Sequence, residues 1–198
     1  NATDGTVTST VTGDVDILDN LLATGRKSTQ ALTITVSSGT VTVSKGALIA
    51  DSTTGSVDYS AVGISDTHAN INSNGSKTDG VTKITAKDGD VNITVTDAVT
   101  ASIGATTVGF TTGTVHFTGG VSDTFANLVS GTSESANMQT IDAEDPNVNI
   151  TISDTISTAT ADNITGLNAL MTATTGTITG TLNGNANILA NLQGDSTP

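Results

Sequence analysis

The sequence predicts an all-β fold with short helical corners, built from stacked, solenoid-like repeats of about 57 residues with two rungs each. Two observations lead to this class. Threonine is the most abundant residue, and glycine, serine and asparagine are frequent, which is typical of strands and tight turns. Aromatic residues are rare, so Val, Ile, Leu and Ala must form the core. The only aromatic residues are Tyr59, Phe110, Phe117 and Phe125.

The repeats predict two rungs per unit because two strand patterns alternate along the sequence. A strand start of the type Gly-Thr-Val recurs and is followed by a short segment rich in aliphatic residues. A second strand pattern lies between these starts, as in "VNITVTDAVTAS" and "VNITISDTISTA", which begin at Val91 and Val148. Each repeat therefore contains two strand signals. The strand starts stand at Gly5, Gly55, Gly113 and Gly176.

Alternation within the strands predicts which side chains are buried. In "VNITVTD", residues 91–97, aliphatic and polar side chains alternate, which is the period-two signature of a strand with one buried face. We expect Thr94, Thr96 and Thr151 to point toward solvent. We expect burial of Ile93, Val95, Val115, Ile150, Ile152 and Ile178.

The motif Ser-Asp-Thr-x-Ala-Asn occurs at positions 65–70 and again at positions 122–127. The same offset relates Val91 to Val148, and we call this relation the internal correspondence. Serine and aspartate side chains often accept hydrogen bonds from main-chain N–H groups at the start of a turn or helix. We therefore expect Asp66 and Asp123 to cap turns that lead into helical corners packed on the sheet.

Other helical corners are predicted by aliphatic spacing and by glycine. "ADNITGLNALM", residues 161–171, has aliphatic residues at helical spacing after a cap expected at Asp162. "NANILANL", residues 185–192, repeats this pattern. Glycines with positive φ are expected to end the corners. These glycines are Gly25, Gly75, Gly131 and Gly194.

The recurring patterns extend along the whole chain, so residues 1–198 are predicted to form one continuous repeat domain. Its units span approximately residues 5–54, 55–112 and 113–175, with a partial unit at 176–198. The alternative is tandem β-sandwich domains, for which the internal correspondence would mark two domains instead of two coils.

The strands "ITVTDA" and "ITISDT", together with the corners "SDTFANL" and "ITGLNAL", resemble tandem repeats of giant secreted bacterial surface proteins. This group includes adhesin-like and S-layer-like proteins of cyanobacteria and proteobacteria. The resemblance implies stacked β modules and an extracellular structural role. It carries over no catalytic residue.

Charge and composition exclude several classes of protein. The formal net charge is −13 and all six Lys and Arg residues precede position 88, so nucleic acid would be repelled. No apolar stretch approaches the length that a membrane span needs. There is no cysteine for a disulfide or a thiolate metal site. The chain begins at Asn1 without methionine, as expected of a processed chain or of a piece of a longer one.

Carboxylates are the most abundant candidates for metal binding, and oxygen-rich clusters suit a hard ion such as calcium. The clusters lie in "GDVDILDN", "KDGDVN" and "DAEDPN", and none has the spacing of a known calcium loop. The rival interpretation is that they form solvated turns, where Asp and Asn are common. No cofactor is required, and calcium is the candidate ion. The candidate ligands are Asp14, Asp16, Asp19, Asp88, Asp90, Asp142, Glu144 and Asp145.

The sequence does not favour an enzyme. His68 and His116 are the only histidines, and neither is accompanied by a recognisable nucleophile motif. His68 aligns with Phe125 in the internal correspondence, which indicates a packing position.

The leading hypothesis is therefore a non-enzymatic, extracellular structural protein, secreted or at the cell surface. It would be a module of a bacterial surface layer, an adhesin stalk or a self-assembling filament. Its expected partners are other copies, joined head to tail or in a lattice through the region Gly5 to Thr12, and surface glycans. The alternative is a calcium- and glycan-binding module.

Overall fold

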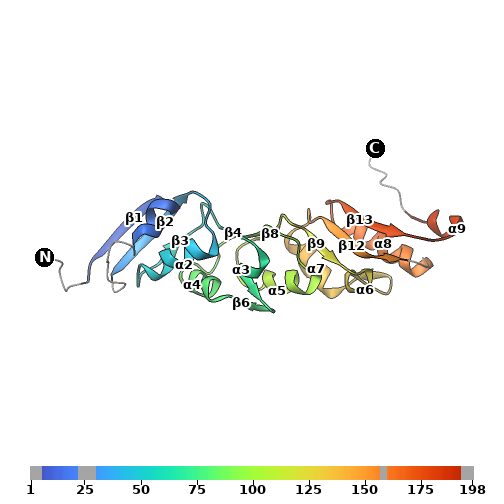
Figure 1. Cartoon of the computed structure of the whole chain (residues 1–198), viewed down its shortest axis with the longest axis horizontal. Helices are drawn as coiled ribbons and strands as arrows, with labels where there is room; N and C mark the ends of the chain where they lie inside the picture. Colours follow the sequence, from blue (N-terminus) through green and yellow to red (C-terminus); the bar gives the residue numbers. More distant parts are fainter. Residues whose placement is uncertain (1–5, 22–29, 157–159, 193–198) are drawn as a thin grey trace. The chain divides into compact units, whose positions relative to one another are not determined.

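The computed structural model describes residues 6–21, 30–156 and 160–192 and shows a mixed α/β protein (Figure 1). It is 37% helical and 29% strand, with small parallel and antiparallel sheets. The prediction of an all-β solenoid of tandem repeats is therefore wrong, and so is the alternative of tandem β-sandwiches. The sequence predicts only short corners between strands, whereas several connections are helices of eight or nine residues.

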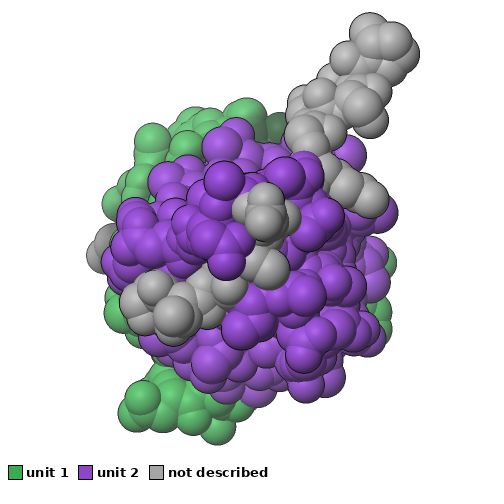
Figure 2. All heavy atoms as spheres, turned by 90° about the vertical axis from the view of Figure 1, so that its right-hand side faces the viewer, with its two compact units in different colours: residues 1–96, 109–115 green, residues 97–108, 116–198 purple. Residues whose placement is uncertain are grey.

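The chain divides into two compact units, which Figure 2 shows in different colours. Unit 1 consists of Asn1–Thr96 and Gly109–Val115, and unit 2 of Asp97–Val108 and His116–Pro198. Each unit contains helices, a short antiparallel hairpin and parallel strand pairs.

Unit 1 contains two sets of parallel strands and one hairpin. Strands β1, β2 and β3 form a parallel sheet, β4 pairs in parallel with β7, and β5 and β6 form the hairpin. The elements are β1 (Thr8–Asp14), α1 (Val15–Leu18), a 3₁₀ turn (Asp19–Leu21), β2 (Ala31–Ser38), α2 (Val43–Asp51), β3 (Val57–Asp58), β4 (Ile64–Asp66), α3 (His68–Ile71), β5 (Asn72–Ser73), β6 (Ser76–Lys77), α4 (Asp79–Lys87) and β7 (Ile93–Val95).

Unit 2 has a parallel sheet in the order β13-β12-β9 and a hairpin of β10 and β11. The chain enters unit 2 at Asp97, returns to unit 1 for Gly109–Val115, and enters unit 2 again within β8 (Val115–Phe117). The other elements are α5 (Ala101–Val108), β9 (Val121–Asp123), α6 (Phe125–Leu128), β10 (Val129–Ser130), β11 (Ser133–Glu134), α7 (Ala136–Glu144), β12 (Ile150–Ile156), α8 (Ala161–Ala173), β13 (Ile178–Leu182) and α9 (Ala186–Leu189).

The predicted inward faces of the strands are largely confirmed. Thr96 and Thr151 are exposed as expected, but Thr94 is half-buried. Ile178 is also only half-buried, because it lies on the outer strand β13. The other five aliphatic residues of the set are buried: Ile93, Val95, Val115, Ile150 and Ile152.

Packing outweighs low helix propensity in α4 and α5, two of the four helices of eight or nine residues. Thr and Val are poor helix formers, and α5 reads ASIGATTV. A Cβ added to Gly104 in α5 would lie 2.7 Å from Cδ1 of Ile141 in α7, so glycine lets these two helices approach closely. In unit 1, a Cβ on Gly46 in α2 would lie 2.8 Å from Cδ1 of Ile84 in α4. Tertiary contact therefore decides the conformation of these segments.

The internal correspondence in the sequence relates mixed sets of helices and strands. The series β4, α3, β5, β6, α4 and β7 in unit 1 has counterparts in β9, α6, β10, β11, α7 and β12 of unit 2. Every pair begins at the same offset in the sequence, from Ile64 and Val121 at the start of the series to Ile93 and Ile150 at its end. The correspondence therefore describes a recurring arrangement of helices and strands, not two coils of strands.

Three copies of Thr-Thr-Gly, whose glycines are three of the predicted strand starts, make the same contacts. The hydroxyl of Thr174 donates a hydrogen bond to the carbonyl oxygen of Val148 (2.7 Å) and accepts one from the N–H of Gly176 (2.9 Å). A Cβ on Gly176 would lie 2.3 Å from that carbonyl oxygen, so only glycine fits. Thr53 with Gly55, and Thr111 with Gly113, repeat these hydroxyl hydrogen bonds in unit 1. A Cβ on Gly55 would lie 2.3 Å from the carbonyl oxygen of Leu32, and one on Gly113 would lie 2.1 Å from that of Asp90.

The corner predictions are partly confirmed. Gly75 and Gly131 have φ of 89° and 65°, as predicted, but they lie in the β5–β6 and β10–β11 turns and do not end a helix. Gly25 and Gly194 lie outside the described residues. The predicted helix at 161–171 exists as α8, but Thr160 caps it in place of Asp162. None of the described helices is long and apolar enough to cross a membrane.

Candidate functional site

The aspartate of the Ser-Asp-Thr-x-Ala-Asn motif joins three segments of unit 1. Asp66 Oδ1 accepts hydrogen bonds from the N–H of Thr67 (2.9 Å) and from Nδ2 of Asn70 (2.7 Å). Its Oδ2 accepts from the N–H of Val43 (3.0 Å), the first residue of α2. The predicted turn cap is confirmed, and the second contact fixes the start of a helix 23 residues earlier in the chain.

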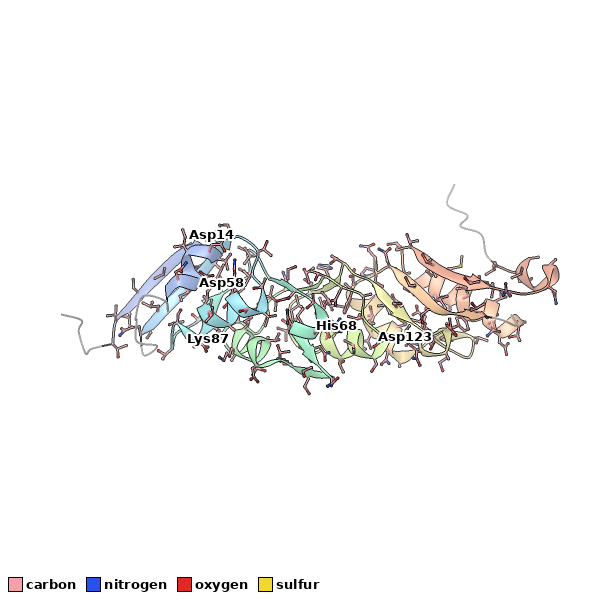
Figure 3. The ribbon with its side chains drawn as sticks, in the orientation of Figure 1. Asp14, Asp58, His68, Lys87 and Asp123 are labelled. Atoms are coloured by element: carbon pink, nitrogen blue, oxygen red, sulfur yellow. The ribbon has the colours of Figure 1, made fainter. Side chains whose placement is uncertain are left out.

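Asp123 makes the same three contacts in unit 2 and is labelled in Figure 3. Oδ1 accepts from the N–H of Thr124 (2.8 Å) and Nδ2 of Asn127 (2.7 Å), while Oδ2 accepts from the N–H of Ala101 (3.1 Å). Asp123 is 8% exposed, so its charge depends on these donors for solvation. The recurring motif is therefore a structural joint in both units.

A polar groove with a volume of about 640 Å³ lies in unit 1 beside Asp66. It is bordered by α2, α3, the β5–β6 hairpin and the start of α4. Its walls offer carboxylate, amide, hydroxyl and ammonium groups, which can hydrogen-bond a polar ligand. The residues that line it are Val43, Ser44, Ala47, Asp66, Ala69, Asn70, Ser73, Ser76, Lys77, Thr78, Asp79 and Gly80.

In the first predicted calcium cluster, Asp14 caps helix α1 and Asp16 forms an ion pair. Asp14 Oδ1 accepts from the N–H of Asp16 (2.9 Å), and its Oδ2 accepts from the hydroxyl of Ser38 (2.8 Å). These two hydrogen bonds, that from Asp16 first, lower the pKa of Asp14. Asp16 pairs with Lys45, and Asp19 accepts from the side chain of Asn20 (3.1 Å).

In the second predicted cluster, the carboxylate of Asp88 holds a main-chain N–H group and Asp90 does not take part in this contact. Asp88 Oδ2 accepts from the N–H of Tyr59 (2.7 Å) in unit 1. Burial, with a smaller contribution from Asp90 beside it, raises the pKa of Asp88. Asp90 itself is exposed.

The third predicted cluster does not converge on one point. Asp145 Oδ2 accepts from the N–H of Phe117 (2.8 Å), and its Oδ1 lies 3.8 Å from Nδ1 of His116. Asp142 instead faces Glu134 on β11, and Glu144 is half-buried near the end of α7. Across the described residues, no group of three or more His, Asp or Glu side chains comes together in a way that could hold a metal ion.

Glu134 is a candidate site residue that the sequence motifs did not reveal. Burial and the neighbouring Asp142 raise the pKa of Glu134 to about 8. A signal was present in the internal correspondence, because Glu134 and Asp142 stand where unit 1 has Lys77 and Thr85. A basic residue is thus replaced by an acidic one at a half-buried position.

Strand β1, one of the two outer strands of the β1-β2-β3 sheet, leaves part of the core of unit 1 open. Among the described residues, β1 pairs only with β2. Val11 on β1 is in register with Ile34 and, through it, with Val57, which are 0% and 2% exposed, yet Val11 itself is only half-buried. Val7 and Ile17 nearby are 41% and 70% exposed.

Strand β13, one of the two outer strands of the β13-β12-β9 sheet, has the same property in unit 2. Within the described part of the chain, β13 pairs only with β12. Ile178 and Leu182 are half-buried, whereas their register partners Ile150 and Ile156 are 1% and 8% exposed. As far as the described residues go, β1 and β13 therefore carry unfilled pairing positions beside aliphatic side chains that are not fully covered.

A scan against protein-family models finds no match to this chain, and neither curated proteins nor solved structures match it.

Proposed function

We propose that this protein is a non-enzymatic structural module of an extracellular surface assembly, and that copies join by strand addition between β1 of one and β13 of the next. The observation that carries the proposal is the pair of outer strands, each with half-buried core side chains along its sheet. The composition and the motifs that resemble bacterial surface proteins support a location outside the cell, as part of a surface layer, stalk or filament.

Strand addition would satisfy the main-chain groups of β1 that face away from β2. Residues of a parallel strand bond alternately to the neighbours on either side. The carbonyl oxygen of Val7 accepts from the N–H of Ala31, so the odd-numbered residues of β1 bond toward β2. The N–H groups of Thr8, Thr10 and Thr12 then point toward the open edge, where a strand from another copy can pair.

Apolar burial favours the contact between β1 and β13, and this contact has less charge repulsion than one between two copies of unit 2. Val7, Val11 and Ile17 at one edge would be covered together with Ile178 and Leu182 at the other, which adds a hydrophobic contribution to the backbone pairing. All six Lys and Arg residues of the chain belong to unit 1. A contact between unit 1 and unit 2 of different copies therefore has less charge repulsion than one between two copies of unit 2.

A proline at Thr10 tests the proposed joint. The Thr10 N–H faces the open edge, so Thr10→Pro removes a donor for the incoming strand and leaves the bonds to β2 in place. We expect the wild type to form open-ended oligomers in sedimentation velocity and light scattering, and T10P to stay monomeric. Thr10→Ser keeps the donor and should assemble like the wild type.

Mixing the two proteins gives a sharper readout. T10P retains an intact β13, so it should add to the β1 edge of a wild-type copy and stop growth there. Small amounts of T10P should then shorten wild-type oligomers, as measured by light scattering. A monomeric wild-type chain would overturn the proposal, and so would assembly by T10P, with circular dichroism used to establish that the variant is folded.

A further inference from the structure

Unit 2 contains a pair of facing carboxyl groups in which three of the four oxygens are buried without a hydrogen-bond partner. Glu134 lies on β11 and Asp142 lies on α7. Asp142 is 9% exposed, and both of its carboxylate oxygens are buried without a hydrogen-bond partner. Oε1 of Glu134 is buried and unpartnered as well. Three carboxyl oxygens are thus removed from water at one place.

Such an arrangement is costly unless a positive charge or a proton compensates it. Buried carboxylates in folded proteins are paired, hydrogen-bonded or bound to metal ions. Several other aspartates follow this rule, including Asp123 and Asp145, which accept hydrogen bonds from main-chain N–H groups. Burial is the main cause that raises the pKa of both Glu134 and Asp142, as expected of a site that favours an added positive charge.

Unit 1 shows what occupies the corresponding place. Lys77 and Thr85 are the counterparts of Glu134 and Asp142 in the internal correspondence. The ammonium group of Lys77 donates a hydrogen bond to the hydroxyl of Thr85, with Nζ and Oγ1 3.0 Å apart. The same position between hairpin and helix therefore holds a cation in unit 1 and two carboxyl groups in unit 2.

We propose that Glu134 and Asp142 bind a hard divalent cation of the calcium class, which takes the place that the Lys77 ammonium group has in unit 1. Two carboxylates give such an ion up to four oxygen ligands, and main-chain carbonyl groups and water supply the others. This site differs from the predicted cluster of Asp142, Glu144 and Asp145, because its second ligand comes from the hairpin and not from the end of α7. The inference is independent of strand addition.

The surrounding charges favour a cation at this position. Asp145 lies close enough to Asp142 to raise its pKa further, and so adds negative potential at the site. Helix α5, which packs against α7, has no charged side chain. Helix α8 packs against β11, and its one charged residue, Asp162, is exposed. Unit 2 contains no Lys or Arg in its sequence that could neutralise the pair.

The test is direct titration of the full-length chain with Ca²⁺, after treatment with a chelator, by isothermal titration calorimetry and thermal unfolding. The matched variant is E134K/D142T, which gives unit 2 the residues that unit 1 already accommodates at the corresponding place. We expect one saturable site and a raised unfolding temperature in the wild type, and neither in the variant. Sodium chloride at equal ionic strength separates binding from general screening.

Two further variants of this chain serve as controls for the binding measurement. Asp162→Asn removes an exposed carboxylate from α8 and should bind Ca²⁺ like the wild type. Glu134→Gln keeps the size of the side chain and should also lose Ca²⁺ binding. This variant supplies the test if E134K/D142T fails to fold. The proposal is overturned if the wild type shows no saturable Ca²⁺ binding, since the pair then holds only a proton. Undiminished binding by E134K/D142T or E134Q would overturn it equally.

Discussion

The carboxylate of Asp123 accepts a hydrogen bond from the main-chain N–H of Ala101, 3.1 Å away and 22 residues earlier in the chain. Asp66 makes the corresponding bond to Val43 in unit 1. Each aspartate also accepts a hydrogen bond from the N–H of the next residue, at the turn that leads into the following short helix, so one side chain fixes both a new turn and the start of an earlier helix. Both copies of the motif therefore have the same structural role.

Replacing Asp123 with alanine should destabilise unit 2. The change removes three hydrogen bonds to an ionised acceptor and leaves the buried N–H of Ala101 without its partner. From the typical cost of losing a helix cap or a charged hydrogen bond, we expect a loss of about 1–3 kcal/mol in the free energy of unfolding. Urea denaturation measures it.

The control for D123A is Asp162→Ala. Asp162 is also an aspartate in the first turn of a helix, but it is exposed and Thr160 provides the cap of α8. Its replacement should cost less than about 1 kcal/mol, the usual range for an exposed charge near a helix N-terminus. Equal losses of unfolding free energy for the two variants would show that the three hydrogen bonds of Asp123 do not stabilise unit 2 more than an exposed charge does.

The strands and their buried faces could be predicted because alternation is a local property of the sequence. Ile93 and Val95 alternate with polar residues, and both are fully buried. Ile178 has the same local pattern but is half-buried, since its exposure depends on its place in the sheet order. Position along a sheet is set by long-range pairing and leaves no local signal.

The helices α2, α4, α5 and α7 could not be predicted in the same way. The Thr, Val and Ile residues of α4 and α5 favour strands, and close contact between helices at Gly46 and Gly104 overrides this preference. The candidate site was missed for a similar reason. Asp142 was recognised as a carboxylate, but its partner Glu134 lies on a different element and reaches it only because hairpin and helix fold together.

Gly113→Ala should destabilise unit 1, because the added Cβ would lie 2.1 Å from the carbonyl oxygen of Asp90. Main chain must move to relieve this overlap, and overpacking of this kind costs about 1–3 kcal/mol. The matched control is Gly89→Ala, where the nearest atom is the Thr85 carbonyl oxygen at 3.8 Å. G89A should be neutral or slightly stabilising. Chemical denaturation of both variants checks the difference, and equal stabilities would contradict the close approach.

Thr174→Val should destabilise unit 2 although it preserves side-chain shape. Valine cannot donate to the carbonyl oxygen of Val148 or accept from the N–H of Gly176, and Thr174 is only 6% exposed. Leaving buried polar groups unsatisfied costs about 1–3 kcal/mol. Thr174→Ser retains the hydroxyl and should lose less stability than T174V in thermal or urea unfolding. A serine variant that is less stable than the valine variant would show that packing, and not hydrogen bonding, is the main contribution of Thr174.

The Glu134–Asp142 pair should make unit 2 less stable as pH rises. The pKa of Glu134 increases from 4.5 to about 8 on folding, because burial and Asp142 disfavour its ionised form. The folded state therefore binds the proton more tightly than the unfolded chain. The resulting stabilisation is fully present below pH 4.5 and is lost as pH rises through about 8. Asp142, whose pKa is also raised, adds to the same trend.

Glu134→Gln isolates this contribution from that of the other titrating groups. Glutamine has nearly the same shape and stays neutral, so the free energy of unfolding of E134Q should fall less than that of the wild type between pH 5 and pH 8. The measurement is urea denaturation across this range with a chelator present, so that no metal ion competes with the proton. Asp162→Asn should keep the wild-type slope. Parallel pH profiles for E134Q and the wild type would show that Glu134 has the same proton affinity in the folded and unfolded chains, contrary to its burial against Asp142.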